Sequence, residues 1–231
     1  MIVRHVTKRP LIAVLAAGCL LGGGTTALAE VTVYDNDFST QGEYNDIANS
    51  GGGKRCDRKY RDKSKVFLAS VKKGPADCAF RPPVQGDDVL PNHSVLIDAK
   101  LLKKTPSDAR KSAFFEITVR AGGKGSGYSL RVFPERQHFA LSRGPEGQGF
   151  PVQGKNKAIK KTNSRNRIEL IATGAQIVAT VNGKQLASVA DSNPGAVEGR
   201  KVRFAIGNQK GKDSKTVGTF KEVAVSVPDP R

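Results

Sequence analysis

The feature that most constrains this chain is an alternation of apolar and polar residues, which recurs at every second position along most of its length. Successive side chains of a β-strand point to opposite faces, so this period is typical of strands with one buried and one exposed face. The only candidate helix is the short segment 106–112. The clearest expected strands are residues 115–120, 128–132, 138–141, 167–172, 176–181, 184–189 and 202–206.

Turn signals separate these strands. Asn182-Gly183 stands between two apolar runs, and this dipeptide is the strongest short signal for a β-hairpin. The pattern predicts an all-β protein with about ten to twelve short strands, arranged as a two-sheet antiparallel β-sandwich or jelly roll. Residues 39–63 and 72–91 are rich in glycine, proline and charge, and we expect them to be irregular.

The N-terminal segment predicts export. A basic start, an apolar stretch over residues 11–21 and the tripeptide Ala27-Leu28-Ala29 together indicate a secretory signal peptide spanning residues 1–29. Cleavage after Ala29 would release residues 30–231 as a single domain, secreted or associated with the cell envelope. An alternative is lipoprotein anchoring at Cys19, because residues 16–19 resemble a lipoprotein cleavage site. No apolar run reaches the roughly 18 residues that a transmembrane segment needs.

The cysteines predict one covalent cross-link. Removal of the signal peptide leaves two of them, Cys56 and Cys78. An even pair in an exported protein predicts a disulfide, which would stabilise the fold by about 3 kcal/mol through lost entropy of the unfolded chain. The bridge would tie the two irregular segments to each other.

No cofactor or metal centre is expected. The two cysteines lack the close partners of a zinc site, and few histidines are present to complete one. Structural calcium is an open alternative, although two neighbouring acids fall short of the six to eight oxygens that calcium takes. Its candidate ligands are Asp35 and Asp37, or Asp87 and Asp88.

The strand sequences resemble a known superfamily. Residues 33–38, 127–132 and 166–172, followed by the hairpin at 177–184, look like the concanavalin A-like lectin/glucanase superfamily. The likeness is greatest to its bacterial laminin-G-like and keto-disaccharide-hydrolase-like branches, and it covers most of residues 31–227. It implies a sandwich that presents a concave sheet face or rim to carbohydrate, sometimes with calcium, and that hydrolyses glycans in some branches.

The residues themselves do not support catalysis. Superfamily glucanases carry their acids in a Glu-x-Asp-x-Glu-like row on one strand, where alternate residues share a face. The matching stretch of the strand 115–120 has Glu116 at the first acid position, and Thr118 and Arg120 where the partner acids belong. No Gly-x-Ser-x-Gly nucleophile elbow is present. We therefore expect no catalytic residues; if the protein is an enzyme, we expect a glycoside hydrolase.

The charge is strongly positive, with 38 Lys and Arg against 21 Asp and Glu and a formal net charge of +17. Residues 155–167 carry six basic and no acidic side chains, so nothing nearby in the chain cancels their field. Such a surface attracts polyanions and loses affinity as salt rises. The candidate ligand-binding residues are Arg120, Tyr128, Arg131, Lys157, Lys160, Lys161, Arg167 and Arg203.

These features predict an exported, non-enzymatic, monomeric protein that recognises a glycan or an anionic cell-envelope polymer through a basic β-sandwich surface. The alternative is a carbohydrate-active hydrolase of the keto-disaccharide-hydrolase-like type. A sequence-specific nucleic-acid partner is not expected, because a β-sandwich has no helix to read the grooves. A sheet face lined by Arg120, Arg131 and Arg203 would favour the anion binder, and two converging carboxylates would favour the hydrolase.

Overall fold

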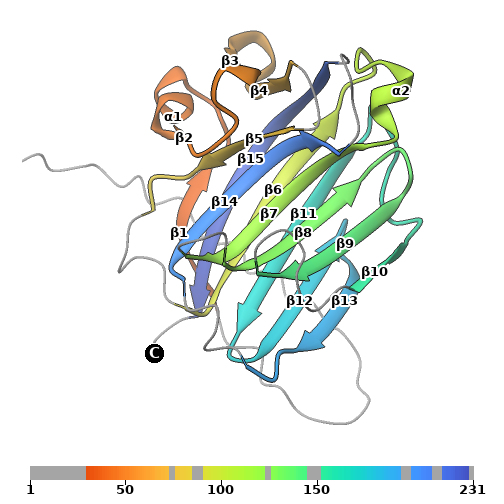
Figure 1. Ribbon diagram of the computed structural model, residues 1–231. Helices are drawn as coiled ribbons and strands as arrows, with labels where there is room; N and C mark the ends of the chain where they lie inside the picture. Colours follow the sequence, from red (N-terminus) through yellow and green to blue (C-terminus); the bar gives the residue numbers. More distant parts are fainter. Residues whose placement is uncertain are drawn as a thin grey trace, which may run out of the picture.

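The computed structural model describes residues 30–72, 76–84, 91–122, 126–144, 152–193, 199–209 and 215–228. The predicted signal peptide (residues 1–29), Cys19 within it, and the candidate calcium ligands Asp87 and Asp88 lie outside these residues. The described chain is nearly all β-strand and forms two antiparallel sheets stacked on each other (Figure 1). The two-sheet β-sandwich predicted from the alternation is therefore confirmed.

The larger sheet, called sheet A, has eight strands. Its main path has the order β13-β12-β11-β6-β15-β4-β3, and β1 pairs with the second part of the long strand β15. Its strands are β1 (Glu30–Asn36), β3 (Cys56–Arg61), β4 (Val66–Val71), β6 (His93–Leu101), β11 (Arg165–Thr173), β12 (Gln176–Val181), β13 (Lys184–Ala190) and β15 (Thr216–Pro228).

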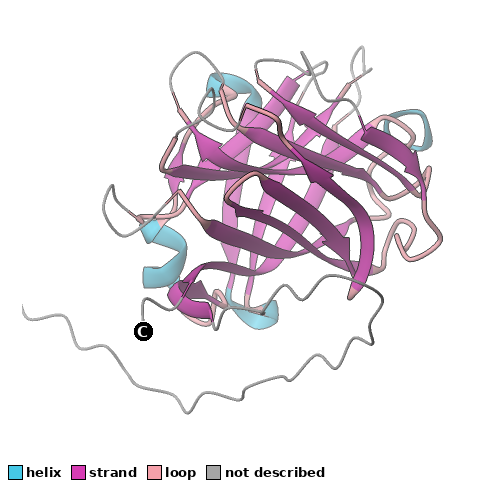
Figure 2. Cartoon of the chain, turned by 90° about the horizontal axis from the view of Figure 1, so that it is seen from below, coloured by secondary structure: helices cyan, strands magenta, loops and turns pink. Residues whose placement is uncertain are grey.

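The smaller sheet, called sheet B, has seven strands in the order β10-β9-β8-β7-β14-β5-β2. Neighbouring strands are often far apart in the sequence, as when β14 lies between β7 and β5. Strands dominate the molecule and the short helices lie at its periphery (Figure 2). The strands of sheet B are β2 (Ala48–Asn49), β5 (Ala76–Arg81), β7 (Ala113–Ala121), β8 (Tyr128–Phe133), β9 (His138–Arg143), β10 (Val152–Lys155) and β14 (Lys201–Asn208).

The core lies between the sheets, where the apolar positions of the alternation meet. Its largest group is a cluster of phenylalanines contributed by both sheets, with ring centres 4.7 to 6.4 Å apart. Burying each such ring contributes about 1.5–3 kcal/mol. The cluster therefore holds the two layers together. Its members are Phe67 of β4, Phe80 of β5, Phe204 of β14 and Phe220 of β15.

The predicted disulfide between Cys56 and Cys78 is confirmed, with 5.4 Å between the two Cα atoms. Cys56 begins β3 in sheet A and Cys78 lies on β5 in sheet B, so the bridge joins the two layers. Gly52 makes room for it. This glycine has a φ of +86°, and a Cβ atom there would collide with the Cys56 sulfur and the Asp77 carbonyl. The position requires glycine for both its conformation and its space.

The segments that we expected to be irregular contain regular elements. Residues 39–63 hold the helix α1 (Gln41–Asp46), the strand β2, the 3₁₀ turn η1 (Gly53–Arg55) and the strand β3, while residues 72–91 hold β5. A second 3₁₀ turn, η2 (Asp62–Ser64), follows β3. The prediction missed these elements because α1 has no buried residue and β3 is too charged to show a clear alternation. The helix α2 (Ser107–Arg110) lies within the expected segment 106–112.

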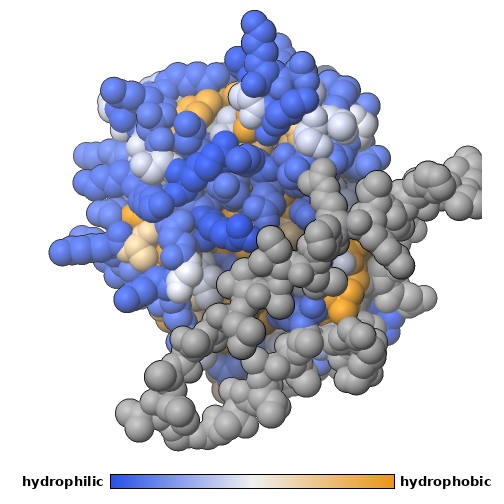
Figure 3. All heavy atoms as spheres, turned by 180° about the vertical axis from the view of Figure 1, so that it is seen from behind, coloured by the Kyte–Doolittle hydropathy of each residue, from blue (hydrophilic) through white to orange (hydrophobic). Residues whose placement is uncertain are grey.

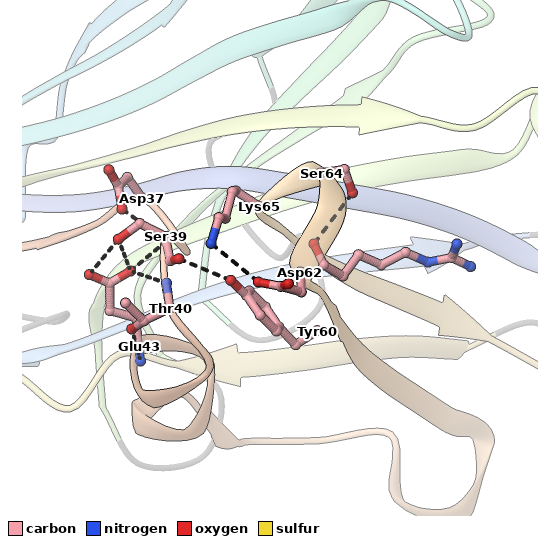
Figure 4. A network of polar contacts seen from close by, with 9 residues as sticks. Asp37, Ser39, Thr40, Glu43, Tyr60, Asp62, Ser64 and Lys65 are labelled. Atoms are coloured by element: carbon pink, nitrogen blue, oxygen red, sulfur yellow. Dashed lines mark hydrogen bonds and ion pairs between the residues drawn. The ribbon is translucent and has the colours of Figure 1, made fainter.

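Local hydrogen bonds explain why α1 forms at all. Thr40 and Glu43 make a capping box, in which each side chain accepts from the backbone N–H of the other, at 3.2 and 3.4 Å (Figure 4). Tyr60 of β3 donates to the Ser39 carbonyl at 3.0 Å. These contacts fix α1 against the edge of sheet A, although the helix itself buries no side chain.

The described surface is mostly polar. Large exposed hydrophobic side chains within it are Val31 and Val33 of β1. Figure 3, a view from behind relative to Figure 1, shows mainly hydrophilic atoms with small hydrophobic areas between them. No helix in the described part of the chain is long and apolar enough to cross a membrane. Charged and hydroxyl side chains therefore dominate the surfaces available to a ligand.

Candidate ligand-binding face of sheet B

Sheet B turns a polar face away from the core. On β7 the odd-numbered residues belong to the core cluster, so Glu116 and Thr118 point outward. The antiparallel register places Arg131 of β8 opposite Glu116, and Arg203 of β14 opposite Thr118. We call this surface the outer face of sheet B. Two of the eight candidate residues, Arg131 and Arg203, share it.

Glu116 and Arg131 form an ion pair near the middle of this face. The Arg131 guanidinium also lies 4.7 Å from the centre of the Phe114 ring, and Thr118 donates to Glu116 at 3.4 Å. The Glu116 side chain is 10% exposed and that of Arg131 is 37% exposed. The charge of Glu116 is thus compensated within the face, while Arg131 keeps part of its surface in contact with solvent.

The side chains of two further arginines on this face, Arg203 and Arg81, make no hydrogen bond or ion pair to any other described residue. Arg203 is half-buried and Arg81, at the end of β5, is exposed. The register of β14 and β5 ends with Phe204 opposite Phe80, and Arg203 and Arg81 occupy the next position beyond this pair on the two adjacent strands. The next outward residues along these strands are the small side chains of Ala205 and Ala79, which are themselves buried. Like charges in this arrangement destabilise a sheet, so an anion between them would be stabilising.

A row of hydroxyl groups extends from Arg203 across the sheet. Thr118 Oγ1 lies 3.0 Å from Ser129 Oγ, and Ser142 of β9 stands opposite Ser129. Hydroxyl groups both donate and accept hydrogen bonds, as the hydroxyl groups of a sugar also do. The outer face of sheet B therefore combines cationic, hydroxyl and small side chains.

Arg120 and Tyr128, two other candidates, are engaged in the structure itself. Arg120 is 4% exposed, and its guanidinium donates to the carbonyl oxygens of Pro91 and Gly174, each at 2.7 Å. Tyr128 is fully buried and its hydroxyl donates to Asp191. Both side chains hold loops and strand ends together, so we leave them out of the proposed site.

Asp191 is the acceptor at the centre of that buried cluster. Arg143 Nη1 lies 2.7 Å from it, and the Asn193 backbone N–H donates to it at 2.9 Å. Burial alone would raise the pKa of Asp191, but these contacts and the Tyr128 hydroxyl hold that pKa below its usual value. Burial and the same carboxylate raise the pKa of Tyr128. At neutral pH the cluster is therefore an ionised Asp191 held by a protonated Tyr128, which is a structural link.

The remaining candidates lie on other surfaces. Arg167 is on the outer face of sheet A, where its Nη2 atom is 3.1 Å from Glu222 Oε1. The structure therefore brings Arg131 and Arg203 together and separates the other candidates from them. Three lysines are exposed on the loop between β10 and β11, at one end of the sandwich: Lys157, Lys160 and Lys161.

Acids are sparse on the outer face of sheet B. Among the described residues the register places two carboxylates on it, Glu116 of β7 and Asp77 of β5. These two strands are separated by β14, and Asp77 is offset from Glu116 by two residues along the strand direction. Regular sheet geometry puts their Cα atoms roughly 12 Å apart, and the conformations of the two side chains set the distance between the carboxyl groups themselves. Glycoside hydrolysis uses carboxyl groups about 5–5.5 Å apart with retention and about 6.5–9.5 Å apart with inversion. In the described ranges no three His, Cys, Asp or Glu residues are grouped to hold a metal ion.

Arg81 was not among the residues expected to bind a ligand, because it falls in a segment that we expected to be irregular. A short signal could have revealed it. Cys78 and Phe80 occupy alternate positions and are both buried, which leaves Asp77, Ala79 and Arg81 as the outward set of a strand. Only the pairing of β5 with β14 then places Arg81 beside Arg203.

Comparison with known proteins supports the fold. No family model and no curated protein matches this sequence. A protein of unknown function with a galectin-like fold from Bacillus subtilis has a TM-score of 0.60 at 14% identity, over 86% of this chain and 97% of that one. The carbohydrate-binding module CBM66 from Bacillus subtilis has a TM-score of 0.50 at 11% identity, over 84% of this chain and 92% of that one.

A glycan-active enzyme has a similar fold. The family 7 alginate lyase A1-II′, in a structure with bound substrate, has a TM-score of 0.54 at 14% identity, over 74% of this chain and 82% of that one. At such low identities the likeness is one of fold. The chain therefore has a jelly-roll β-sandwich fold, which is consistent with a concanavalin A-like fold.

Proposed function

We propose that this chain is an exported, non-enzymatic protein that binds an acidic glycan through the outer face of sheet B. Its disulfide supports export to an oxidising compartment, where such bonds persist. Its fold neighbours include a carbohydrate-binding module and an alginate lyase with bound substrate, which supports carbohydrate as the ligand class. Within the superfamily we assign it, from its strand sequences, to the laminin-G-like and keto-disaccharide-hydrolase-like branches.

The observation that carries the proposal is the unpartnered arginine pair, Arg203 and Arg81. Two cations beside each other on adjacent strands of a sheet repel, and a carboxylate between them would remove that repulsion. Arginine presents parallel N–H donors that match the two oxygens of a carboxylate. A uronic acid supplies that carboxylate on a sugar ring, and its hydroxyl groups can meet the half-buried hydroxyls of Ser129 and Ser142, which lie beyond Thr118 from Arg203.

The direct test measures binding of the exported protein to polygalacturonate and to an uncharged glucan by calorimetry. We expect binding to polygalacturonate. Arg203→Gln should weaken it by about 30-fold or more, because losing one partner of a desolvated charge pair costs about 2 kcal/mol or more. Arg81→Gln should weaken it by a smaller factor, since Arg81 is exposed.

A matched control removes an arginine from the opposite face. Arg167→Gln takes away the same charge, but Arg167 belongs to sheet A and is paired with Glu222. We expect it to change the affinity by less than about twofold. Equal losses from Arg203→Gln and Arg167→Gln would mean that net charge alone drives binding, and the proposed site would be wrong.

The alternative, a glycan hydrolase, is tested on the same protein. Glu116 and Asp77 share the outer face of sheet B, so a hydrolase would use them. We expect no reducing ends to appear when the protein is incubated with polygalacturonate or with β-glucan. If the unmodified protein releases reducing ends and the Glu116→Gln variant does not, the protein is a hydrolase and the proposal of a non-enzymatic binding protein is wrong.

A further inference from the structure

The loop between β10 and β11 lies at the centre of a second basic surface, formed by four segments at one end of the sandwich. Asn163 N–H donates to the Leu101 carbonyl at 2.8 Å, which joins the loop to residues 101–105. Gln137 Nε2 donates to the Ile159 carbonyl at 2.8 Å, which joins it to the turn 134–137. The hairpin turn 182–184 completes the group. We call these four segments the cationic end.

Asparagine side chains hold this loop in place. Asn182 Nδ2 donates to the Ala158 carbonyl at 2.7 Å and so fixes the hairpin turn to the loop. Asn166 is fully buried, accepts from the Lys160 backbone N–H at 2.8 Å and donates to the Lys160 carbonyl at 2.9 Å. Ile159 is fully buried in the core. The loop is thus anchored through its backbone, which leaves its lysine side chains projecting from a fixed frame.

The cationic end carries seven exposed basic side chains and one acid. None of the seven makes an ion pair to another described residue, and the acid, Glu135, accepts a hydrogen bond from Thr162 at 2.6 Å. Burial and the nearby charges of Arg61 and Lys215 lower the pKa of Lys104, as expected where cations gather without acids. The seven are Lys103, Lys104, Arg136, Lys157, Lys160, Lys161 and Lys184.

The choice of side chain indicates the kind of anion. Six of the seven cations are lysines, whereas the outer face of sheet B uses arginines. Arginine's planar fork matches carboxylate and phosphate groups in a fixed bidentate geometry, whereas lysine binds phosphate as a mobile point charge, so a lysine-rich surface suits a phosphate polymer held by charge without fixed geometry. The large exposed hydrophobic side chains in the described chain, Val31 and Val33, are on β1 and not in these segments. Attraction here therefore depends on charge and not on apolar insertion.

We propose that the cationic end is a separate docking surface for a linear polyanion that carries phosphate groups. It lies at the strand ends, whereas Arg203 lies beside Thr118 in the middle of the sheet. Thr118 pairs with Ser129 of β8. The β8–β9 turn, which belongs to the cationic end, begins five residues farther along the chain, which is roughly 17 Å in an extended strand. A polyanion on the end leaves the outer face of sheet B free. The protein can then hold a glycan and a phosphate polymer at the same time.

The docking surface does not depend on the proposed glycan site, but the simultaneous binding of a glycan and a phosphate polymer rests on that site. The probe is a fluorescent linear polyphosphate, titrated with the exported protein over a range of salt concentrations. The test variant carries Lys157→Gln, Lys160→Gln and Lys161→Gln. Because each phosphate contact releases a counterion, we expect the log–log salt slope to fall by about one for each lysine removed. The affinity at low salt should fall by about tenfold or more.

A matched control removes three exposed lysines that lie outside the cationic end, by Lys59→Gln, Lys63→Gln and Lys221→Gln. This variant has the same net charge as the test variant, and we expect its affinity to change less than about threefold. Equal losses in both variants would show attraction to net charge alone and overturn the proposal. Absence of polyphosphate binding in the unmodified protein would overturn it as well.

Glycan binding distinguishes this proposal from the first. The test variant should keep its affinity for polygalacturonate, and Arg203→Gln should keep its affinity for polyphosphate. Competition between the two polymers on the unmodified protein would mean one shared site and would overturn the separate docking surface. If polygalacturonate does not bind at all, the glycan proposal fails, and the polyphosphate titrations still decide the docking surface. Thermal unfolding of both triple variants should match that of the unmodified protein, because the six lysines are exposed and unpaired.

Discussion

The two outer faces of the sandwich use arginine in different ways. On sheet A, each outward arginine of β11 has an acid on another strand: Arg165 with Asp98 at 3.4 Å and Arg167 with Glu222 at 3.1 Å. On sheet B, Arg131 has Glu116, but Arg203 and Arg81, on adjacent strands, have no acid partner among the described residues. The strands of both faces come from the same alternating pattern, so the difference lies in what stands beside each arginine.

This difference indicates which face is stabilised by a bound anion. A paired arginine must give up its partner before it binds an anion, so the net gain is small. An unpaired arginine beside a second arginine loses repulsion when an anion arrives. The arginine charges on the outer face of sheet A are therefore compensated by acids, whereas those of Arg203 and Arg81 on sheet B are not.

The largest effect should follow from removing the acid of the central pair on sheet B. Glu116→Ala should lower the free energy of unfolding by about 1–2 kcal/mol, because it leaves the partly buried Arg131 without its partner. The matched change on sheet A, Glu222→Ala, should cost at most about 0.5 kcal/mol, since Arg167 is 58% exposed. Urea unfolding measures both. Equal losses would contradict the distinction drawn between the two faces.

An intermediate effect concerns pH and the sheet A carboxylate Glu169. Burial and the charge of Glu30 raise the pKa of Glu169 above its ordinary value of 4.5, although Thr180 and Arg167 act in the opposite sense. The folded state then holds this proton more tightly than the unfolded chain, so the free energy of unfolding falls as pH rises from 4.5 through the raised pKa. Below pH 4.5, the stabilisation of the folded state by protonated Glu169 is fully present.

Glu169→Gln should remove this dependence. We expect the variant to be more stable than the unmodified protein by about 0.5 kcal/mol above the raised pKa, and equally stable below pH 4.5. Urea unfolding at a series of pH values measures the difference. Two stability curves that run parallel across this range would show that Glu169 is already compensated.

The smallest effect should be a change in the free energy of unfolding that has opposite signs when an unpaired and a paired arginine are removed. Arg203→Gln removes repulsion from Arg81 and should raise the free energy of unfolding by about 0.2–0.5 kcal/mol. Arg167→Gln removes an exposed ion pair and should lower it by about 0.3 kcal/mol. Thermal unfolding at low ionic strength measures both changes. A loss of stability in Arg203→Gln would show that Arg203 has a stabilising partner after all.

Much of the fold could be predicted because its signals are local. The alternation around Phe115 and Ile117 indicates a strand with one buried face, and Asn182-Gly183 adopts the left-handed turn expected of a hairpin, with φ angles of 50° and 76°. The disulfide followed from the cysteine count in an exported chain. Where the local signal was weak, as in β3 and α1, the prediction failed. There, cross-strand pairing and a capping box determine the structure instead.

The candidate site was predicted only in part. Arg131 and Arg203 share the outer face of sheet B, but Arg120 and Tyr128 hold the structure together and Arg167 faces the other way. An alternating pattern says that a side chain points away from the core, but it does not say which of two sheets the strand joins. The same pattern also gives no sign that Arg120, which the alternation predicts to point outward, will be buried at a strand end.

The sequence by itself therefore determined most of the strands, the sandwich and the disulfide, because periodicity and cysteine count are properties of the chain before it folds. Only the tertiary structure decided which charges meet. Arg203 lies beside Arg81 because β14 inserts between β7 and β5, and Arg167 meets Glu222 because both strands belong to sheet A. The physical reason is that strand order is set by how both sheets bury their apolar faces together, which is a property of the whole chain.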